Sequence, residues 1–157
     1  MVMSAKVSVA LCATVLVLGC RKRHLDARIQ AVQDTVPFYQ LPKQASFAVT
    51  TIVHNDDHQR LFVALCGMEA QREIDGNWTT VFMPACPSNG LTPLEPGDSI
   101  VVPVRITAYT DNTFPQLDPR MKPGRYRILF GVFNGDPEGR SAATIGQAEP
   151  STPFIAK

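Results

Sequence analysis

The fold of this chain is decided by one stretch, residues 99–109, which reads Ser-Ile-Val-Val-Pro-Val-Arg-Ile-Thr-Ala-Tyr. Every second residue in it is apolar: Ile100, Val102, Val104, Ile106 and Ala108. Because successive side chains of a β-strand point to opposite faces, this period of two predicts a strand with one face in a core. Pro103 falls on the other face and has no N–H to donate, which favours an edge strand or a bulge there.

Shorter runs with strand character lie on both sides of this stretch. Residues 124–133 and 47–54 alternate in the same way, whereas 61–65 is a continuous apolar run, typical of a strand buried on both faces. Residues 141–148 and 152–156 supply one or two further strands. About seven short strands separated by turn signals predict an all-β protein with a single antiparallel β-sandwich.

Asp75-Gly76 is a hairpin signal, and strand-like residues flank it on both sides. If the loop has two residues, Ile74 pairs with Asn77, and Cys66 is then one residue away from direct opposition to Cys86. A three-residue loop or a single bulge would bring the two cysteines opposite each other. We therefore expect a structural disulfide between them, which should stabilise the domain by roughly 3 kcal/mol.

Residues 121–126, Met-Lys-Pro-Gly-Arg-Tyr, resemble the L-x-P-G-x-Y turn that enters the F strand of Ig-like and fibronectin-type-III-like domains. Three further segments are similar to small bacterial Ig-like envelope domains, namely 75–78, 94–99 and 151–155. The resemblance covers about residues 45–156 and implies an Ig-like sandwich. It also implies a tyrosine corner, in which Pro123 and Gly124 form a tight turn and the Tyr126 hydroxyl bonds to the backbone near residues 117–121.

The N-terminus has the pattern of an export signal. Residues 1–6 carry positive charge, and residues 7–18 are apolar but too few to span a bilayer. Val17-Leu18-Gly19-Cys20 resembles the lipobox read by the bacterial lipoprotein signal peptidase. The resemblance implies that Cys20 carries a diacylglyceryl group, becomes the mature N-terminus and anchors the chain to a membrane of the cell envelope, facing the periplasm or exterior.

Three regions follow from these patterns: a signal peptide at 1–19, a lipidated N-terminus with linker at 20–44, and an Ig-like domain at 45–157. Arg21, Lys22 and Arg23 oppose translocation, so a cytoplasmic protein with a peripheral or inserted anchor stays open. Simple secretion without a lipid is a further alternative. On a lipidated chain the same run would lie against anionic head groups. Apolar residues within 24–36 have helical spacing, and this segment is either a short docked helix or a linker without fixed structure.

Charge and motifs exclude several functions. With 15 basic and 14 acidic residues, the chain lacks the positive surface that nucleic-acid binding requires. It contains no nucleophile-elbow, phosphate-loop or dinucleotide motif, so we expect no enzyme, catalytic residue or cofactor. Two groups of potential metal ligands are expected to be solvated loop residues instead, and no metal site is predicted: His54, Asp56, Asp57 and His58, and the loop acids Asp111, Asp118 and Asp136.

These observations favour a non-enzymatic binding or assembly module held at the membrane surface by its lipid, with a protein or other envelope component as partner. A protease-inhibitor or chaperone-like sandwich is the alternative, and residues 110–122 are its only long reactive-loop candidate. A hydrolytic or metal-dependent enzyme is the third and least favoured reading. Trp78 is expected to pack in the core or on the hairpin instead of serving as a ligand platform.

Overall fold

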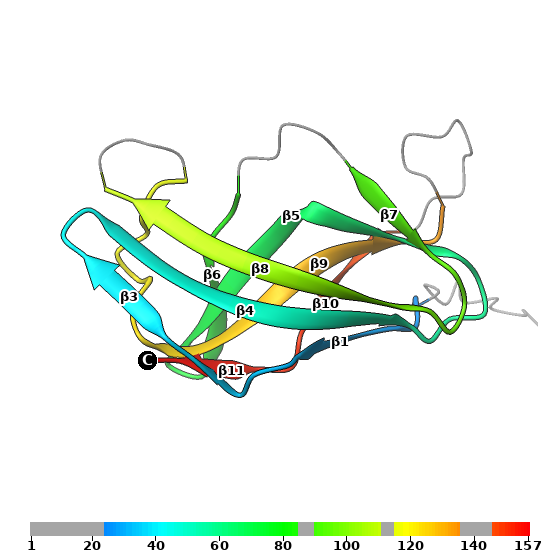
Figure 1. Cartoon of the computed structure of the whole chain (residues 1–157), viewed down its shortest axis with the longest axis horizontal. Helices are drawn as coiled ribbons and strands as arrows, with labels where there is room; N and C mark the ends of the chain where they lie inside the picture. Colours follow the sequence, from blue (N-terminus) through cyan, green and yellow to red (C-terminus); the bar gives the residue numbers. More distant parts are fainter. Residues whose placement is uncertain (1–23, 85–89, 111–114, 136–145) are drawn as a thin grey trace, which may run out of the picture.

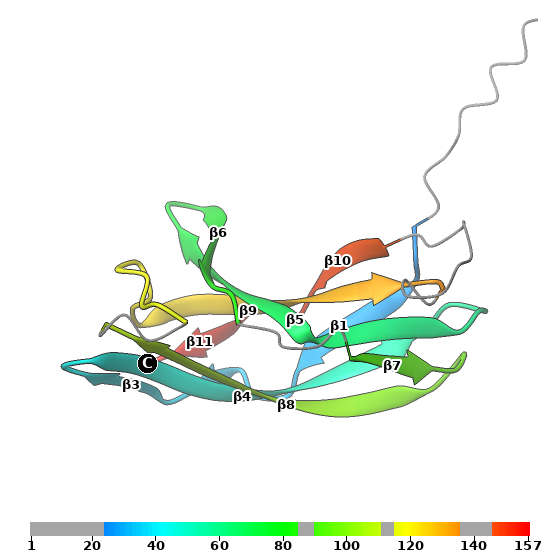
Figure 2. The same cartoon turned by 90° about the horizontal axis from the view of Figure 1, so that it is seen from above.

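The computed structural model describes residues 24–84, 90–110, 115–135 and 146–157. Within these ranges the chain forms eleven strands and no helix, and so it contains no helix that could cross a membrane. The strands make two sheets packed face to face, seen from one side in Figure 1 and as two layers in Figure 2. The predicted all-β sandwich is confirmed.

Sheet A is built around β4. Its four strands are β1 (Ala27–Ala31), β3 (Phe38–Leu41), β4 (Gln44–Asn55) and β8 (Ser99–Tyr109). β1 and β3 pair with the two halves of β4 on one side, and β8 pairs along the whole of β4 on the other, all antiparallel. β8 pairs with no other described strand, so the expected edge position of Pro103, opposite Thr50, is confirmed.

Sheet B is built around β5 and β9, and it consists of β2 (Thr35–Val36), β5 (Leu61–Ile74), β6 (Asn77–Phe82), β7 (Leu91–Leu94), β9 (Gly124–Phe133), β10 (Gly146–Pro150) and β11 (Phe154–Ala156). β6 and β7 pair with β5, whereas β10 and β11 pair with β9. β2 runs parallel to β11. In the lettering of Ig domains, β4 and β8 are strands B and E, and β5 and β9 are strands C and F, which gives the Ig-like division between two sheets.

Aromatic rings join the two sheets in the core. Phe47 of β4 lies 4.8 Å from Tyr126 of β9 and 5.8 Å from Phe154 of β11, measured between ring centroids. All three side chains are buried, because each occupies an inward position of an alternating strand. Aromatic pairs at these separations add to the stability gained by burying their area.

The expectation for residues 24–36 was wrong, because this segment is neither a helix nor a linker. Residues 27–31 form β1, in which Ile29 pairs with Val53 of β4. Leu25 is fully buried, and the amide side chain of Gln147 bonds to its backbone N–H (2.9 Å) and carbonyl (2.6 Å). The inward positions are 25, 27, 29 and 31, two of them alanines, and so the period of two is hidden in the sequence. With β1, β2 and β3, strands begin well before residue 45, and the count exceeds the expected seven.

The hairpin after β5 has the expected register. Asp75 and Gly76 both have positive φ, 50° and 77°, as a two-residue type I′ turn requires, and Ile74 pairs with Asn77. A single irregularity follows between Ala70 and Gln71. This irregularity shifts the pairing by one residue, which is the shift that would bring Cys66 opposite Cys86. The apolar run 61–65 and the strand-like residues before the turn form one continuous strand, β5.

Candidate functional site

The outer face of sheet A is hollowed along β4. Buried residues alternate along this strand, so Ser46, Ala48 and Thr50 point outward, and all three side chains are small. Two adjoining hollows of about 390 and 260 Å³ lie over them, and both are lined by Ala48 and by Arg105 of β8. We call these two hollows the trough.

Longer side chains form the sides of the trough. Ser46 pairs with Tyr39 of β3 on one side and Thr107 of β8 on the other, and these strands are about 10 Å apart across β4. Ala48 pairs with Arg105 in the next row. The trough therefore results from a row of small residues on the central strand between larger residues on its two neighbours.

The smaller hollow lies where the chain leaves sheet A between β1 and β3. There the backbone N–H of Thr50 donates to the side-chain carbonyl of Gln33 (2.9 Å), and Val32 N–H donates to the Thr50 carbonyl (2.8 Å). Gln33 thus takes the place of a missing strand partner and lines the hollow. The backbone at the floor of the trough is consequently paired along its length.

Among the described residues, Arg105 is the single charged one that lines the trough. It is exposed and forms no ion pair within the described ranges. The same face carries large apolar side chains that are more than half exposed, among them Tyr39 (59%), Leu41 (54%) and Val101 (66%). Exposed apolar side chains gathered on one face mark interaction sites more often than singly scattered ones.

The outer face of sheet B is different, because its polar groups are matched to one another. The guanidinium carbons of Arg127 and Arg125 lie 4.5 and 5.7 Å from the ring centroid of Trp78. Arg125 pairs with Glu73 (2.7 Å), and Arg127 donates to Gln71 (2.8 Å). Burial lowers the pKa of Arg127. Trp78 is half-buried, and its ring packs against the two outward arginines of β9, partners that the sequence analysis missed.

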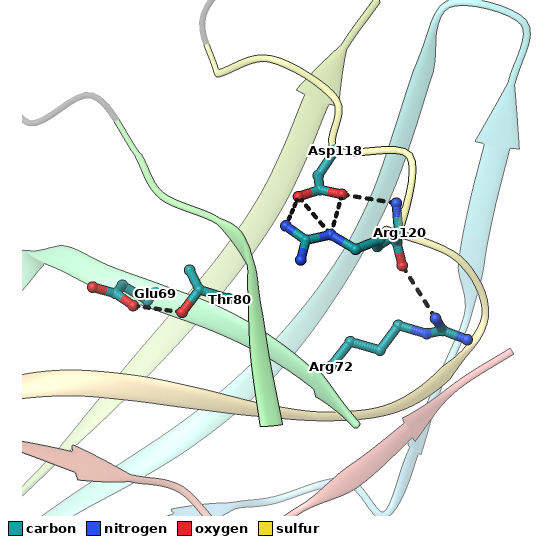
Figure 3. Close-up of polar contacts among 5 residues, drawn as sticks. All are labelled: Glu69, Arg72, Thr80, Asp118 and Arg120. Atoms are coloured by element: carbon teal, nitrogen blue, oxygen red, sulfur yellow. Dashed lines mark hydrogen bonds and ion pairs between the residues drawn. The ribbon is translucent and has the colours of Figure 1, made fainter. Parts of the chain in front are cut away.

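A polar cluster, drawn in Figure 3, lies at the end of the sandwich opposite the start of β1 (Figure 1). The Asp118 carboxylate accepts hydrogen bonds from the guanidinium Nε and from the backbone N–H of Arg120, which lower the pKa of that carboxyl. Arg72 donates to the carbonyls of Arg120 and Pro123, both at 3.2 Å. The cluster holds the turn before β9 together, so we assign it a structural role.

The turn places Tyr126 at the start of β9 with its ring buried. Its hydroxyl donates to the Lys122 carbonyl (2.6 Å), one residue beyond the expected range of 117–121. Gly124 has a φ of 157°, a conformation that residues with a side chain rarely adopt, and a Cβ there would lie 2.8 Å from Arg72 Nε.

The other residues singled out in the sequence are separated or outside the described ranges. His54 bonds to Ser99 (2.6 Å), Asp56 pairs with Arg28 (3.0 Å), and His58 lies 3.2 Å from Asp57. In the described part of the chain, no three His, Cys, Asp or Glu side chains are grouped as metal ligands would be. Asp111 and Asp136 lie outside that part.

Among the cysteines, only Cys66 lies in the described ranges, on β5, whereas Cys20 and Cys86 do not. The lipid anchor and the disulfide stay predictions. Of the suggested reactive loop at 110–122, residues 111–114 are likewise outside the described ranges. Its next part is tied to β8, because Tyr109 N–H donates to the Pro115 carbonyl and Leu117 N–H donates to the Tyr109 carbonyl.

No protein-family model and no curated protein matches the chain. Among solved structures it is similar to a protein from Archaeoglobus fulgidus, with 12% identity and a TM-score of 0.36 over 84% of this chain and 96% of that one. It is also similar to β-glucosidases. That from Listeria innocua has 11% identity and a TM-score of 0.33 over 84% of this chain and 17% of the enzyme. That from Erythrobacter marinus has 14% identity and a TM-score of 0.33 over 82% of this chain and 15% of the enzyme. Similarities this weak carry no argument about function.

Proposed function

We propose that this chain is a lipid-anchored protein of the bacterial cell envelope whose sandwich is a non-enzymatic binding module, with the trough as its binding surface. One observation carries the proposal, a difference between the two outer faces. The outer face of sheet A is hollowed and holds an exposed arginine, Arg105, that forms no ion pair in the described ranges. On the outer face of sheet B the polar groups are matched to one another. Concave surfaces with a few unmatched polar groups are the usual ligand sites of proteins.

The position of Leu25 bears on how the module would be held. Leu25 is buried and lies five residues after Cys20, the proposed site of the lipid. A segment of this length spans at most about 18 Å when fully extended. A lipid on Cys20 would therefore hold the domain next to the membrane, with the end at which β1 begins closest to it and the C-terminus at the opposite end (Figure 1).

The anchor is tested by mass spectrometry of the detergent-extracted protein. We expect the N-terminal peptide to begin at Cys20 with a diacylglyceryl adduct, and we expect Cys20→Ser to leave an unprocessed precursor. An unmodified Cys20 in membrane-bound protein would contradict the lipid anchor without affecting the trough.

The binding surface is tested by photo-crosslinking in growing cells. A photoreactive amino acid replaces Thr107, at the side of the trough, or Ile155, which is exposed on the outer face of sheet B, as a matched control. We expect a discrete envelope component to crosslink from position 107 and not from position 155. Equal crosslinking from both positions, or from 155 alone, would argue against the trough.

A further inference from the structure

We infer that the trough binds a linear saccharide chain that carries carboxylate groups, with one carboxylate at Arg105. This inference rests on the proposed function, since it names the class of ligand for the same surface. It depends on three features: the side-chain chemistry of the trough, its paired backbone, and the position of the one charged side chain among its described lining residues.

The trough offers side-chain hydroxyls and amides instead of backbone groups. Tyr39, Ser46 and Thr107 line the larger hollow with Gln44, and Gln33, whose side-chain oxygen already accepts from Thr50 N–H, lines the smaller one. Hydroxyl and amide groups both donate and accept hydrogen bonds, as the hydroxyls of a sugar do. Tyr39, 59% exposed, adds an aromatic ring on which the C–H face of a sugar ring can pack.

An extended peptide is a poorer match to this surface. Peptides that bind to sheets as added strands use unpaired backbone N–H and carbonyl groups at an edge. The trough lies over β4, whose backbone is paired with β3 and β8 and, at Thr50, with Gln33 and Val32. A ligand in the trough is therefore recognised by side chains alone.

The shape and the charge of the trough narrow the class of ligand further. The two hollows follow one another along β4 from Gln44 to Thr50, a length of about 20 Å, which suits a chain of linked rings better than a single ring. No carboxylate of the described residues lines either hollow, and Arg105 lies where they meet. A guanidinium binds a carboxylate through two parallel hydrogen bonds. A single cation among the described lining residues is too few for nucleic acid, whose binding depends on several phosphate contacts.

A second copy of the chain is disfavoured as the occupant. If two such faces packed symmetrically over the trough, their central Arg105 side chains would meet, and like charges at an interface oppose association.

The test measures binding of the full, detergent-solubilised protein to three linear carboxylated polysaccharides: polygalacturonate, alginate and hyaluronan. The carboxyl-reduced form of each is the matched neutral polymer, and poly-L-glutamate is the matched polyanionic peptide. We expect at least one polysaccharide to bind, and its carboxyl-reduced form to bind about tenfold more weakly or worse.

Variants identify the site. Arg105→Gln should weaken binding of the carboxylated polymer about tenfold and leave binding of the reduced polymer unchanged. Tyr39→Ala should weaken both. Arg28→Gln removes an exposed arginine from the same face outside the trough, and it should change neither. The unfolding midpoint of each variant, expected to equal that of the wild type, shows that the fold is intact.

Three results would overturn the inference: no binding of any of the three polysaccharides, equal loss with Arg28→Gln, or tighter binding of poly-L-glutamate through Arg105. The crosslink from position 107 shows whether only the saccharide inference has failed or the proposed function has failed as well. A position-107 crosslink that no polysaccharide displaces would keep the trough as a binding surface but reject the saccharide. Absence of both the crosslink and saccharide binding would reject both.

Discussion

The hydroxyl of Tyr126 donates a 2.6 Å hydrogen bond to the carbonyl oxygen of Lys122, four residues earlier in the chain. The ring meanwhile packs against Phe47 of the opposite sheet. One side chain therefore fixes the turn before β9 and joins the two layers of the sandwich. We therefore expect the stability of the fold that forms the trough to depend on this residue.

Removing only the hydroxyl of Tyr126 tests this role. Tyr126→Phe should lower the free energy of unfolding by about 1 kcal/mol or somewhat more, because the carbonyl of Lys122 loses its partner. Urea melts measure the change. Tyr39→Phe, which removes a hydroxyl from an exposed ring, is the control and should have no effect. A Tyr126→Phe protein as stable as the wild type would leave Tyr126 without a special structural role.

The same residue predicts a loss of stability at high pH. Burial raises the pKa of Tyr126 to about 12 from its ordinary value of 10.0. The unfolded chain then loses this proton at a lower pH than the folded one. Stability that is fully present below pH 10 therefore falls between pH 10 and about 12, by at most about 1.4 kcal/mol per pH unit. Urea midpoints from pH 9 to 11.5 should fall more steeply for the wild type than for Tyr126→Phe. Parallel curves would contradict the prediction.

Gly124 should tolerate no side chain while Arg72 keeps its place. A Cβ at this position would lie 2.8 Å from Arg72 Nε and would displace a guanidinium that bonds to two carbonyls of the turn. We expect Gly124→Ala to destabilise the domain by about 1–3 kcal/mol in urea melts. Gly67→Ala is the matched control, since an added Cβ there meets nothing within 4 Å.

A double-mutant cycle identifies the cause. If the clash with Arg72 is responsible, Gly124→Ala should cost much less in an Arg72→Ala background. Additive effects of the two substitutions would show that the loss at Gly124 comes from the backbone instead.

The disulfide prediction is tested by peptide mapping of the exported protein without reduction. We expect one peptide pair joined through Cys66 and Cys86, because the bulge between Ala70 and Gln71 shifts the hairpin register in the required direction. Replacing both cysteines by serine should lower the free energy of unfolding by about 3 kcal/mol. Two thiols that react freely with an alkylating agent in the folded protein would contradict the pairing.

The sequence predicted features that depend on local chemistry. Asp75-Gly76 determined the turn and its register, because few residues other than Gly, Asn and Asp adopt positive φ at both positions. Pro103 predicted an edge, since proline cannot donate to a neighbouring strand. Both predictions depend on the conformational preferences of single residues and not on contacts with distant parts of the chain.

Features that depend on distant partners were missed. Ala27 and Ala31 occupy inward positions of β1, but alanine is too weakly apolar to reveal a period of two. The trough is invisible in sequence because Ser46 and Ala48 become its floor only when β3 and β8 pair on either side of β4. Likewise, no local sequence pattern predicts that Trp78 packs against the arginines of β9.

Filling the trough tests the central claim most directly. Ala48 lines both hollows and is exposed, so Ala48→Trp should block the trough while changing the free energy of unfolding by no more than about 0.5 kcal/mol. Ala148→Trp, at an exposed alanine of β10 in sheet B, is the matched control. We predict that the envelope component crosslinked from position 107 is lost in the Ala48→Trp protein and retained in the Ala148→Trp protein. Undiminished crosslinking in a stably folded Ala48→Trp protein would contradict the assignment of the trough as the binding surface.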